Sequence, residues 1–560
     1  MVRTILLGCL LAASAAAQTD ARLNALADRF FNEYYFHFYP TTATSDGFHQ
    51  YDTKLEDYSQ RGIQAQIHVL TGFEREFAAL SPSPDRDLVL GRIRADLLAL
   101  RDIRSWEKNP DDYSSGVTNS LFTIISRNFA PQEERMKSAI ARERQIPEVF
   151  AAARENLKNP PRVYTEIALE QLPGIVGFFE HDVPEAFAEV TDRKLQDQFK
   201  AANRKAIVSL REYQTFLKTN LLPRSNGDFR IGAENYRKKL LYEEMVDVPL
   251  DRLLAIGYEN LRQNQQALER TAAKIDPNKS PRDVLTALEK DHPLAGDLLS
   301  TFRGVLAGLR DFVTRRQIVT IPSSVPPIVE ETPPFLRALT TASMDTPGPY
   351  EKVAKEAFFN VTLPEKGWDK ARREDYMKGF NRGTIISTAI HEVYPGHYVQ
   401  FLWLRRVPSK IRKLLGCSSN AEGWAHYTEQ MMLDEGYGNG DLKLRLGQLQ
   451  DALLRDARYI VGIEMHTGHM SLDRAVEFFE KEGYQTHEVA LKEAKRGTSD
   501  PTYLVYTLGK LEILKLREDY RKREGARFSL KAFHDAFLAQ GYPPIKIVRE
   551  ELLGNSGPLL

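Results

Sequence analysis

Residues 391–397 read HEVYPGH. They contain two histidines, His391 and His397, and a glutamate, Glu392, whose side chains are able to bind a metal ion and to use it in a reaction. In the metal-binding pattern HExxH the histidines are four residues apart. On a helix they then lie about 40° apart and both reach one ion, while the glutamate acts on its water. Here they are six residues apart, and an unbroken helix would separate them by about 240°. Because Pro395 removes a backbone donor and Gly396 permits unusual dihedral angles, we expect the helix to break there and return His397 to the side of His391.

A third candidate ligand is Glu422, which follows His397 by 25 residues and lies on a separate predicted helix. Two imidazoles and one carboxylate leave a fourth position open for water, which is the pattern of catalytic zinc sites. We therefore predict one Zn²⁺ per chain, bound by His391, His397 and Glu422. Glu392 is then the general base of a hydrolytic reaction. Two alternatives stay open: the histidines are incidental to a helix end, or His426 replaces His397 as a ligand.

The two motifs together resemble those of the DUF885 bacterial proteins, which are similar to gluzincin-type zinc metallopeptidases. The resemblance is carried by HExxPGH at 391–397 and EGWAxYxE at 422–429, followed by the helix of Arg458 and His466 and the segment 501–509. It extends weakly to the N-terminal residues 39–40 and 47–52. It implies a mainly α-helical, two-lobed body with a deep central cleft and a small β element. It also implies a zinc metallopeptidase of carboxypeptidase or oligopeptidase type that acts on short peptides.

Further roles follow from this hypothesis. The charge that develops on the scissile carbonyl oxygen needs a donor, and similar zinc peptidases use a C-terminal Tyr or His for this purpose. Tyr506 and His466 are the candidates, although either fits equally well as a core residue. Glu429 lies on the same helix face as Glu422, so it is a candidate to hold a ligating imidazole by a hydrogen bond.

Several basic residues are candidates to bind the terminal carboxylate of a substrate. Arg458 either does this bidentately or holds a buried carboxylate of the protein itself, and we favour the structural role. Arg496 and Lys510 are weaker candidates for the same task, and both also fit as surface charges.

Other functions compete with a metallopeptidase. A helical peptide-binding protein without catalysis would keep the cleft, but it has no need of Glu392. A zinc amidohydrolase acting on a non-peptide amide uses the same chemistry, so the motif does not separate it from a peptidase. The GxSxG motif of serine hydrolases is absent from the sequence, and the glycine-rich segment 436–440 follows a helix, which favours a loop over a nucleotide site.

The elements that position these residues are predicted to be mostly helices. Residues 384–393 have one apolar face and one polar stripe, and a second helix should begin near Asn420 and end near Gly436. A third carries Arg458 and His466, and Pro501 opens a last long helix. Two β-like runs, 317–321 and 358–363, are predicted to pair in a small sheet.

A proline-rich segment at 321–349 is the candidate boundary between two lobes, because it cannot form a continuous helix. It predicts a helical N-terminal lobe at 18–320 and a catalytic lobe at 321–560, unless 18–560 forms one continuous domain. The chain has 560 residues, of which 42% are hydrophobic, and this excludes intrinsic disorder. Oligomeric state is not written in the sequence.

Charge and targeting signals bear on partners and location. The chain has 76 basic and 76 acidic residues, so no global field attracts nucleic acid. Residues 1–17 read as a signal peptide cleaved after Ala17, which predicts export to the periplasm or medium without stable membrane insertion. Lipid anchoring at Cys9 is the weaker alternative, because almost no apolar run precedes it. Only Cys417 then remains, so no intrachain disulfide forms.

Overall fold

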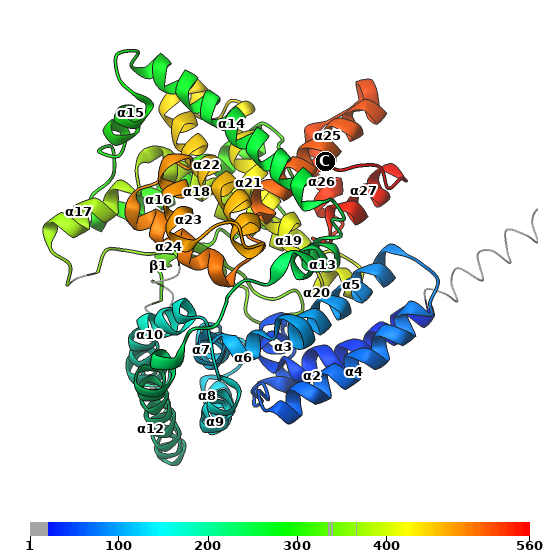
Figure 1. The fold of residues 1–560 in the computed structure, drawn as a ribbon, viewed down its shortest axis with the longest axis vertical. Helices are drawn as coiled ribbons and strands as arrows, with labels where there is room; N and C mark the ends of the chain where they lie inside the picture. The colour runs from blue at the N-terminus through cyan, green and yellow to red at the C-terminus, as the bar shows by residue number, and fades with distance from the viewer. Residues whose placement is uncertain (1–20, 334–336, 338–339, 366) are drawn as a thin grey trace, which may run out of the picture. The chain divides into compact units, whose positions relative to one another are not determined.

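The computed structural model describes residues 21–560 except 334–336, 338–339 and 366 (Figure 1). The predicted signal peptide 1–17, with Cys9, lies outside the described residues. Within them the fold is mainly α-helical with one small sheet, as predicted. No helix among the described residues has the length and apolar character needed to cross a bilayer.

The described chain divides into two compact units. One holds the described residues up to Gly227 together with Tyr350–Ala354 and Ser409–Leu415. Its helices are α2 (Phe36–Phe38), α3 (Pro40–Asp46), α4 (Gln60–Ala78), α5 (Pro84–Leu98), α6 (Ser105–Lys108), α7 (Asp111–Ile125), α8 (Gln132–Glu143), α9 (Ile146–Asn156), α10 (Arg162–Gly177), α11 (Val183–Ala186), α12 (Arg193–Phe216) and α20 (Lys410–Leu414).

The second unit holds Asp228–Pro349, Lys355–Pro408 and Gly416–Leu560, and it contains every candidate site residue. Its helices are α13 (Gly232–Glu244), α14 (Leu250–Ile275), α15 (Pro281–Leu288), α16 (Leu298–Arg315), α17 (Lys370–Lys378), α18 (Arg382–Glu392), α19 (His397–Leu404), α21 (Ser418–Asp434), α22 (Leu442–His466), α23 (Leu472–Lys481), α24 (His487–Ser499), α25 (Val505–Glu524), α26 (Leu530–Leu538) and α27 (Ile545–Leu553).

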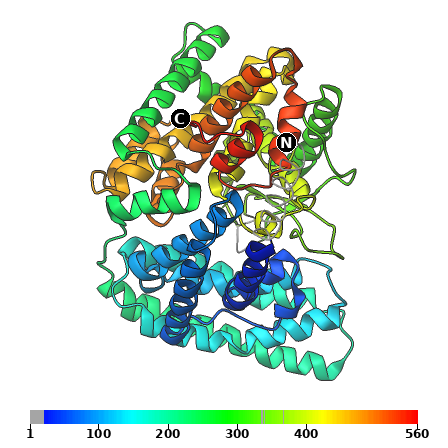
Figure 2. The same cartoon turned by 90° about the vertical axis from the view of Figure 1, so that its right-hand side faces the viewer.

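The boundary between the units therefore falls at 227/228, whereas the proline-rich segment predicted it at 320/321. Residues 228–320 pack with the second unit because α14 is strongly amphipathic. Its Leu253 and Leu261 share one buried cluster with Leu453 and Ile460 of α22. Figure 1 labels this helix pair, and Figure 2 shows the same ribbon turned by 90°. Burying an apolar stripe along the length of a helix outweighs the local composition change at the prolines.

The small sheet has three strands in the order β1-β3-β2. Strand β3 (Phe358–Val361) lies parallel to β1 (Ile328–Glu331) and antiparallel to β2 (Ala342–Asp345). Residues 358–361 of the predicted run 358–363 thus form a strand, but its predicted partner 317–321 does not. Gln317 has φ +53° and Ile318 N donates to Val313 O over 3.1 Å, so this segment caps the end of α16.

The chemistry-bearing helices begin close to their predicted positions. The Asn381 side chain caps α18 by accepting hydrogen bonds from two backbone amides. Helix α21 begins at Ser418, two residues before the predicted cap Asn420, and Gly436 follows its end at φ +95°. Helix α25 begins at Val505 rather than Pro501, and it is the last long helix, since α26 and α27 after it have nine residues each.

Helices α21 and α25 touch backbone to backbone through two glycines. A Cβ on Gly509 would lie 1.7 Å from Ser419 O, and one on Gly423 would lie 2.5 Å from Gly509 Cα. Any side chain at either position would push the helices apart. This close approach brings the first turn of α25, which carries Tyr506, next to the turn of α21 that carries Glu422.

Candidate metal centre

The helix break between the two histidines forms as predicted. Helix α18 ends at Glu392 and α19 begins at His397, and between them Gly396 N donates to Ile390 O over 3.0 Å. A Cβ at residue 396 would lie 1.7 Å from His391 O, so only glycine fits this turn. His391 precedes this turn and His397 follows it, and both imidazoles are directed toward Glu422.

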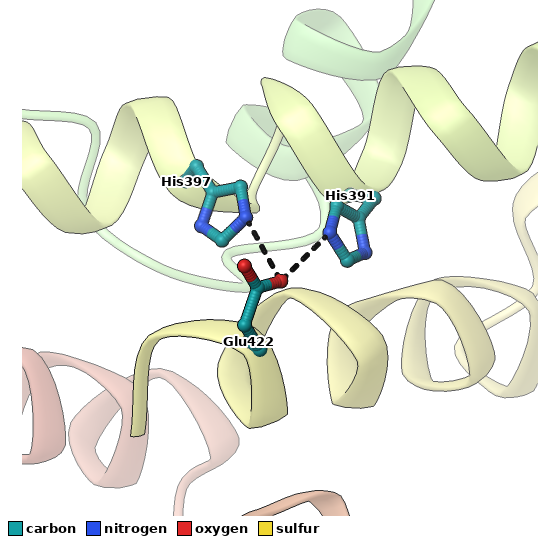
Figure 3. A group of neighbouring side chains, drawn as sticks. All are labelled: His391, His397 and Glu422. Atoms are coloured by element: carbon teal, nitrogen blue, oxygen red, sulfur yellow. Dashed lines mark ion pairs between the residues drawn. The ribbon is translucent and has the colours of Figure 1, made fainter. Parts of the chain in front are cut away.

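The structure brings His391, His397 and Glu422 together, with one ligand atom from each within 4.8 Å of the others. Glu422 Oε2 lies 3.4 Å from His391 Nε2 and 3.4 Å from His397 Nε2, as Figure 3 shows. Ligands about 2.0–2.1 Å from a tetrahedral zinc ion are separated from each other by about 3.3 Å. The two separations from Glu422 Oε2 therefore match those of ligands around a common ion.

The chemistry of the donor atoms fits zinc as well. Glu422 Oε2 is buried and has no hydrogen-bond partner among the described residues, although two imidazole nitrogens lie beside it. Burial alone raises the pKa of Glu422, but the neighbouring imidazoles outweigh burial and hold it well below its ordinary value. The side chain of Glu422 is 27% exposed, against 7% for His391. A carboxylate held charged, two imidazoles and access from solvent suit a divalent cation.

Glu429 holds the imidazole of His391 in position. Its Oε1 lies 2.7 Å from His391 Nδ1, which leaves Nε2 directed toward Glu422. Burial raises the pKa of Glu429, but the Arg455 guanidinium 3.0 Å away and the hydrogen bond with the His426 ring outweigh burial and hold that pKa well below the usual range. The carboxylate is thus charged and orients His391, which is the role the sequence suggested for it.

Arg455 is a residue that the sequence reasoning missed. Its side chain is 11% exposed and neutralises the fully buried Glu429. Its position relative to Arg458 could have pointed to it, because Arg455 lies one helical turn earlier on α22 and both guanidinium groups lie over the Tyr506 ring. Without a motif to mark it, one arginine on a long helix is indistinguishable from a surface charge.

His426 does not join the three candidate ligands. Its Nδ1 lies 3.1 Å from Glu429 Oε2, on the far oxygen of the carboxylate that holds His391. The imidazole is fully buried, and burial lowers its pKa to about 3. His426 therefore packs behind Glu429 as a neutral ring, and His397 is the histidine that lies beside Glu422.

Glu392 follows His391 directly and ends α18. Burial raises the pKa of its carboxyl, while the positive fields of His391 and His397 act in the opposite direction. A raised pKa makes a carboxylate a stronger base for accepting and returning a proton. Glu392 therefore lies in the field of the candidate ligands, and its role as a general base stays a prediction.

The two candidate oxyanion donors differ sharply in position. The Tyr506 ring lies nearly parallel to His391 with ring centres 6.4 Å apart, and its hydroxyl accepts a hydrogen bond from Arg496 over 3.3 Å. His466 is fully buried, and its Nε2 lies 2.7 Å from Gly497 O. It stands eleven residues after Arg455 on α22, about 16 Å further along the helix. The structure places Tyr506 beside the centre and His466 away from it.

Arg458 has the structural role that we favoured. Its Nε and Nη2 donate to the two oxygens of Glu493 over 2.7 and 2.8 Å, and only 10% of each side chain is exposed. The pair is bidentate and buried, so Arg458 is committed to this carboxylate and is poorly placed to exchange it for a substrate. Its guanidinium also lies over the Tyr506 ring, 4.9 Å from the ring centre, which fixes that ring in place.

A family model described as "Bacterial protein of unknown function (DUF885)" matches residues 40–552. The chain belongs to the DUF885 family. Among solved structures, "a putative lipoprotein of unknown function from Shewanella oneidensis" is 27% identical with a TM-score of 0.78, covering 96% of this chain and 99% of its own. "The putative lipoprotein from Colwellia psychrerythraea" has a TM-score of 0.80 at 18% identity, covering 95% and 98%, and shows the fold alone. No curated protein matches this DUF885 chain.

Proposed function

We propose that this protein is an exported zinc-dependent peptidase that hydrolyses short peptides. The observation that carries the proposal is the position of Glu422 Oε2, at 3.4 Å from the Nε2 atoms of both His391 and His397. Two imidazoles and a carboxylate with one open position are the ligand set of catalytic zinc. The Glu429 carboxylate behind His391 supports the same reading, since ligating histidines are oriented by such partners.

Each residue of the centre has a task in peptide hydrolysis. A zinc ion held by the three ligands would supply a Lewis acid that polarises a carbonyl and acidifies water. Glu392 accepts the proton of the attacking water and passes it to the amine that leaves. Tyr506 accepts a hydrogen bond from Arg496, so its own proton is free to stabilise the negative carbonyl oxygen. Burial raises the pKa of Tyr506, which keeps that proton in place.

Export is part of the proposal. The signal-like segment 1–17 supports it, and the two structural relatives described as lipoproteins carry names of exported proteins. We propose a periplasmic or secreted protein, with anchoring through Cys9 as the weaker form. A fractionation of producing cells checks this, because the cytoplasmic fraction should contain little of the protein.

The decisive experiment measures zinc content and hydrolysis together. Purified without chelator, the protein should contain about one zinc ion per chain, and Glu422→Ala should lose most of it. Glu488→Ala is the matched control, since this exposed glutamate on α24 has no part in the centre. Glu392→Gln should keep the zinc and lose about 10²–10⁴-fold in peptide hydrolysis.

Three outcomes would contradict the proposal. The first is native protein that contains no zinc even after incubation with the metal. The second is zinc-loaded protein that cleaves no peptide of a mixed library but hydrolyses other amides, which would identify an amidohydrolase. The third is zinc-loaded protein that binds peptides without cleaving them, which would identify a binding protein.

A further inference from the structure

Three arginines surround the Tyr506 ring beside the candidate metal centre. Their guanidinium carbons lie 5.9 Å (Arg455), 4.9 Å (Arg458) and 5.8 Å (Arg496) from the ring centre. Each guanidinium also has a carboxylate partner in the protein, so an arginine here can bind a negatively charged part of a substrate only if that partner is readily displaced. Which arginine is available to bind it depends on the partners that each already has.

Two of the three are committed to carboxylates of the protein. Arg458 is paired bidentately with Glu493 in a buried site, and Arg455 neutralises the buried Glu429. Withdrawing either one would leave a buried carboxylate uncompensated, which is strongly unfavourable. Lys510 is equally unsuitable, because it is 2% exposed and its positive charge lies in the field of the buried Asp456 and Glu429.

Arg496 is in a different situation. Its side chain is 39% exposed, and its carboxylate partner is Asp500, four residues on and equally exposed. Arg496 Nε and Nη2 donate to one oxygen of Asp500 over 3.2 and 2.9 Å, and Nη2 also donates to the Tyr506 hydroxyl over 3.3 Å, whereas Nη1 has no hydrogen-bond partner among the described residues. An exposed ion pair of this kind contributes little to stability, so a second carboxylate competes with it readily.

The distance from Arg496 to the metal centre fits the end of a peptide. The path runs from the His391 ring to the Tyr506 ring, 6.4 Å between centres, and on to the Arg496 guanidinium at 5.8 Å. An extended peptide advances about 3.3–3.6 Å per residue. A terminal carboxylate bound to Arg496 would therefore place a bond within the last few residues at the metal.

We propose that Arg496 binds the C-terminal carboxylate of the substrate, so that the protein is a carboxypeptidase that releases one to three residues. This inference rests on the proposed peptidase function and adds the end of the peptide from which residues are removed. The planar guanidinium matches a carboxylate in geometry and charge. Tyr506 links the two ends of the site, since it contacts Arg496 at its hydroxyl and faces His391 with its ring.

The test uses a mixed set of eight-residue peptides, each made with a free C-terminal carboxylate and as the C-terminal amide. Mass spectrometry of the digests should show the zinc-loaded protein releasing short C-terminal fragments from the free acids. The amides should be cleaved about 10- to 100-fold less efficiently, which corresponds to losing a charge-assisted hydrogen-bonded pair. In Arg496→Ala this preference should fall to near one, mainly through a rise in KM, and Arg496→Lys should keep part of it.

Arg521→Ala is the matched control, because Arg521 is an exposed arginine that pairs with Glu518 on α25, and it should keep the full preference. Equal cleavage of acids and amides, or a preference that survives in Arg496→Ala, would overturn the inference while leaving the peptidase proposal standing. Cleavage at internal bonds alone would do the same.

A second readout does not need turnover: calorimetric titration of Glu392→Gln with the peptides should show tighter binding of the acids, and adding Arg496→Ala should abolish the difference. If zinc-loaded protein cleaves nothing, the peptidase proposal fails, and the inference fails with it.

Discussion

The indole Nε1 of Trp424 donates a hydrogen bond to the carbonyl oxygen of Pro395 over 2.9 Å. Trp424 lies on α21, two residues after Glu422, and Pro395 lies in the turn that separates the two histidines. This one bond therefore ties the turn that presents His397 to the helix that presents the carboxylate. Trp424 is fully buried and Pro395 is buried, and the indole also stacks on Phe537 with ring centres 5.5 Å apart.

Trp424→Phe should weaken zinc binding. Phenylalanine keeps an aromatic ring against Phe537 but leaves the Pro395 carbonyl buried without a donor, at a cost of about 1–3 kcal/mol. We expect about a tenfold loss of zinc affinity, measured by competition with a chromophoric chelator. Trp403→Phe is the control, because Trp403 donates an equivalent bond to Thr320 O. Unchanged zinc affinity in folded Trp424→Phe would show that this bond does not position the ligands.

Glu429→Gln should lower zinc affinity by about 10–100-fold, since it removes the charge that orients and polarises His391 but keeps the shape of the side chain. The same chelator competition measures the effect. Gln430→Ala, at the next residue of α21, should leave the affinity unchanged. Glu429→Gln protein that is folded and binds zinc as tightly as the native protein would assign this carboxylate to charge balance with Arg455 alone.

The two histidines that competed for the third ligand position can be separated by substitution. His397→Ala should abolish stoichiometric zinc binding, because its Nε2 faces Glu422. His426→Ala should keep about one zinc ion per chain, with a weaker affinity if Glu429 loses its alignment. Zinc analysis of the two variants distinguishes the cases, and the reverse pattern would make His426 the ligand.

Glu143 on α8 should make stability depend on pH. Burial raises the pKa of its carboxyl to about 8, although Asn203 donates a hydrogen bond to it over 2.9 Å. The folded protein then keeps a proton that the unfolded chain, with a pKa of about 4.3, releases. Because the folded state binds more protons in that window, this contribution to stability is lost as pH rises through the folded pKa.

Glu143→Gln imitates the neutral carboxyl and removes this loss. Its urea unfolding midpoint should exceed that of the native protein by more at pH 9 than at pH 5. Glu148→Gln, at an exposed position on α9, should show no such trend. A difference between Glu143→Gln and native protein that stays constant with pH would mean that Glu143 is charged in the folded state.

Much of the local structure follows from neighbouring residues alone. The break after Glu392 was predictable because Pro395 and Gly396 act on the backbone within one helical turn. The helical character of α18, α21 and α22, and a strand near 358–361, were predictable from the periodicity of apolar residues. The candidate ligands His391, His397 and Glu422 were identified by residue type and spacing.

Tertiary structure decided the questions in which distant residues compete for one place. It put His397 beside Glu422 and His426 behind Glu429, and it placed Tyr506 at the centre while removing His466 from it. It also paired Arg458 with Glu493, assigned residues 228–320 to the second unit and gave β3 its partners. These outcomes depend on which apolar faces are buried together and which buried charges are compensated. Such choices involve segments that are far apart in the chain, so no local pattern contains them.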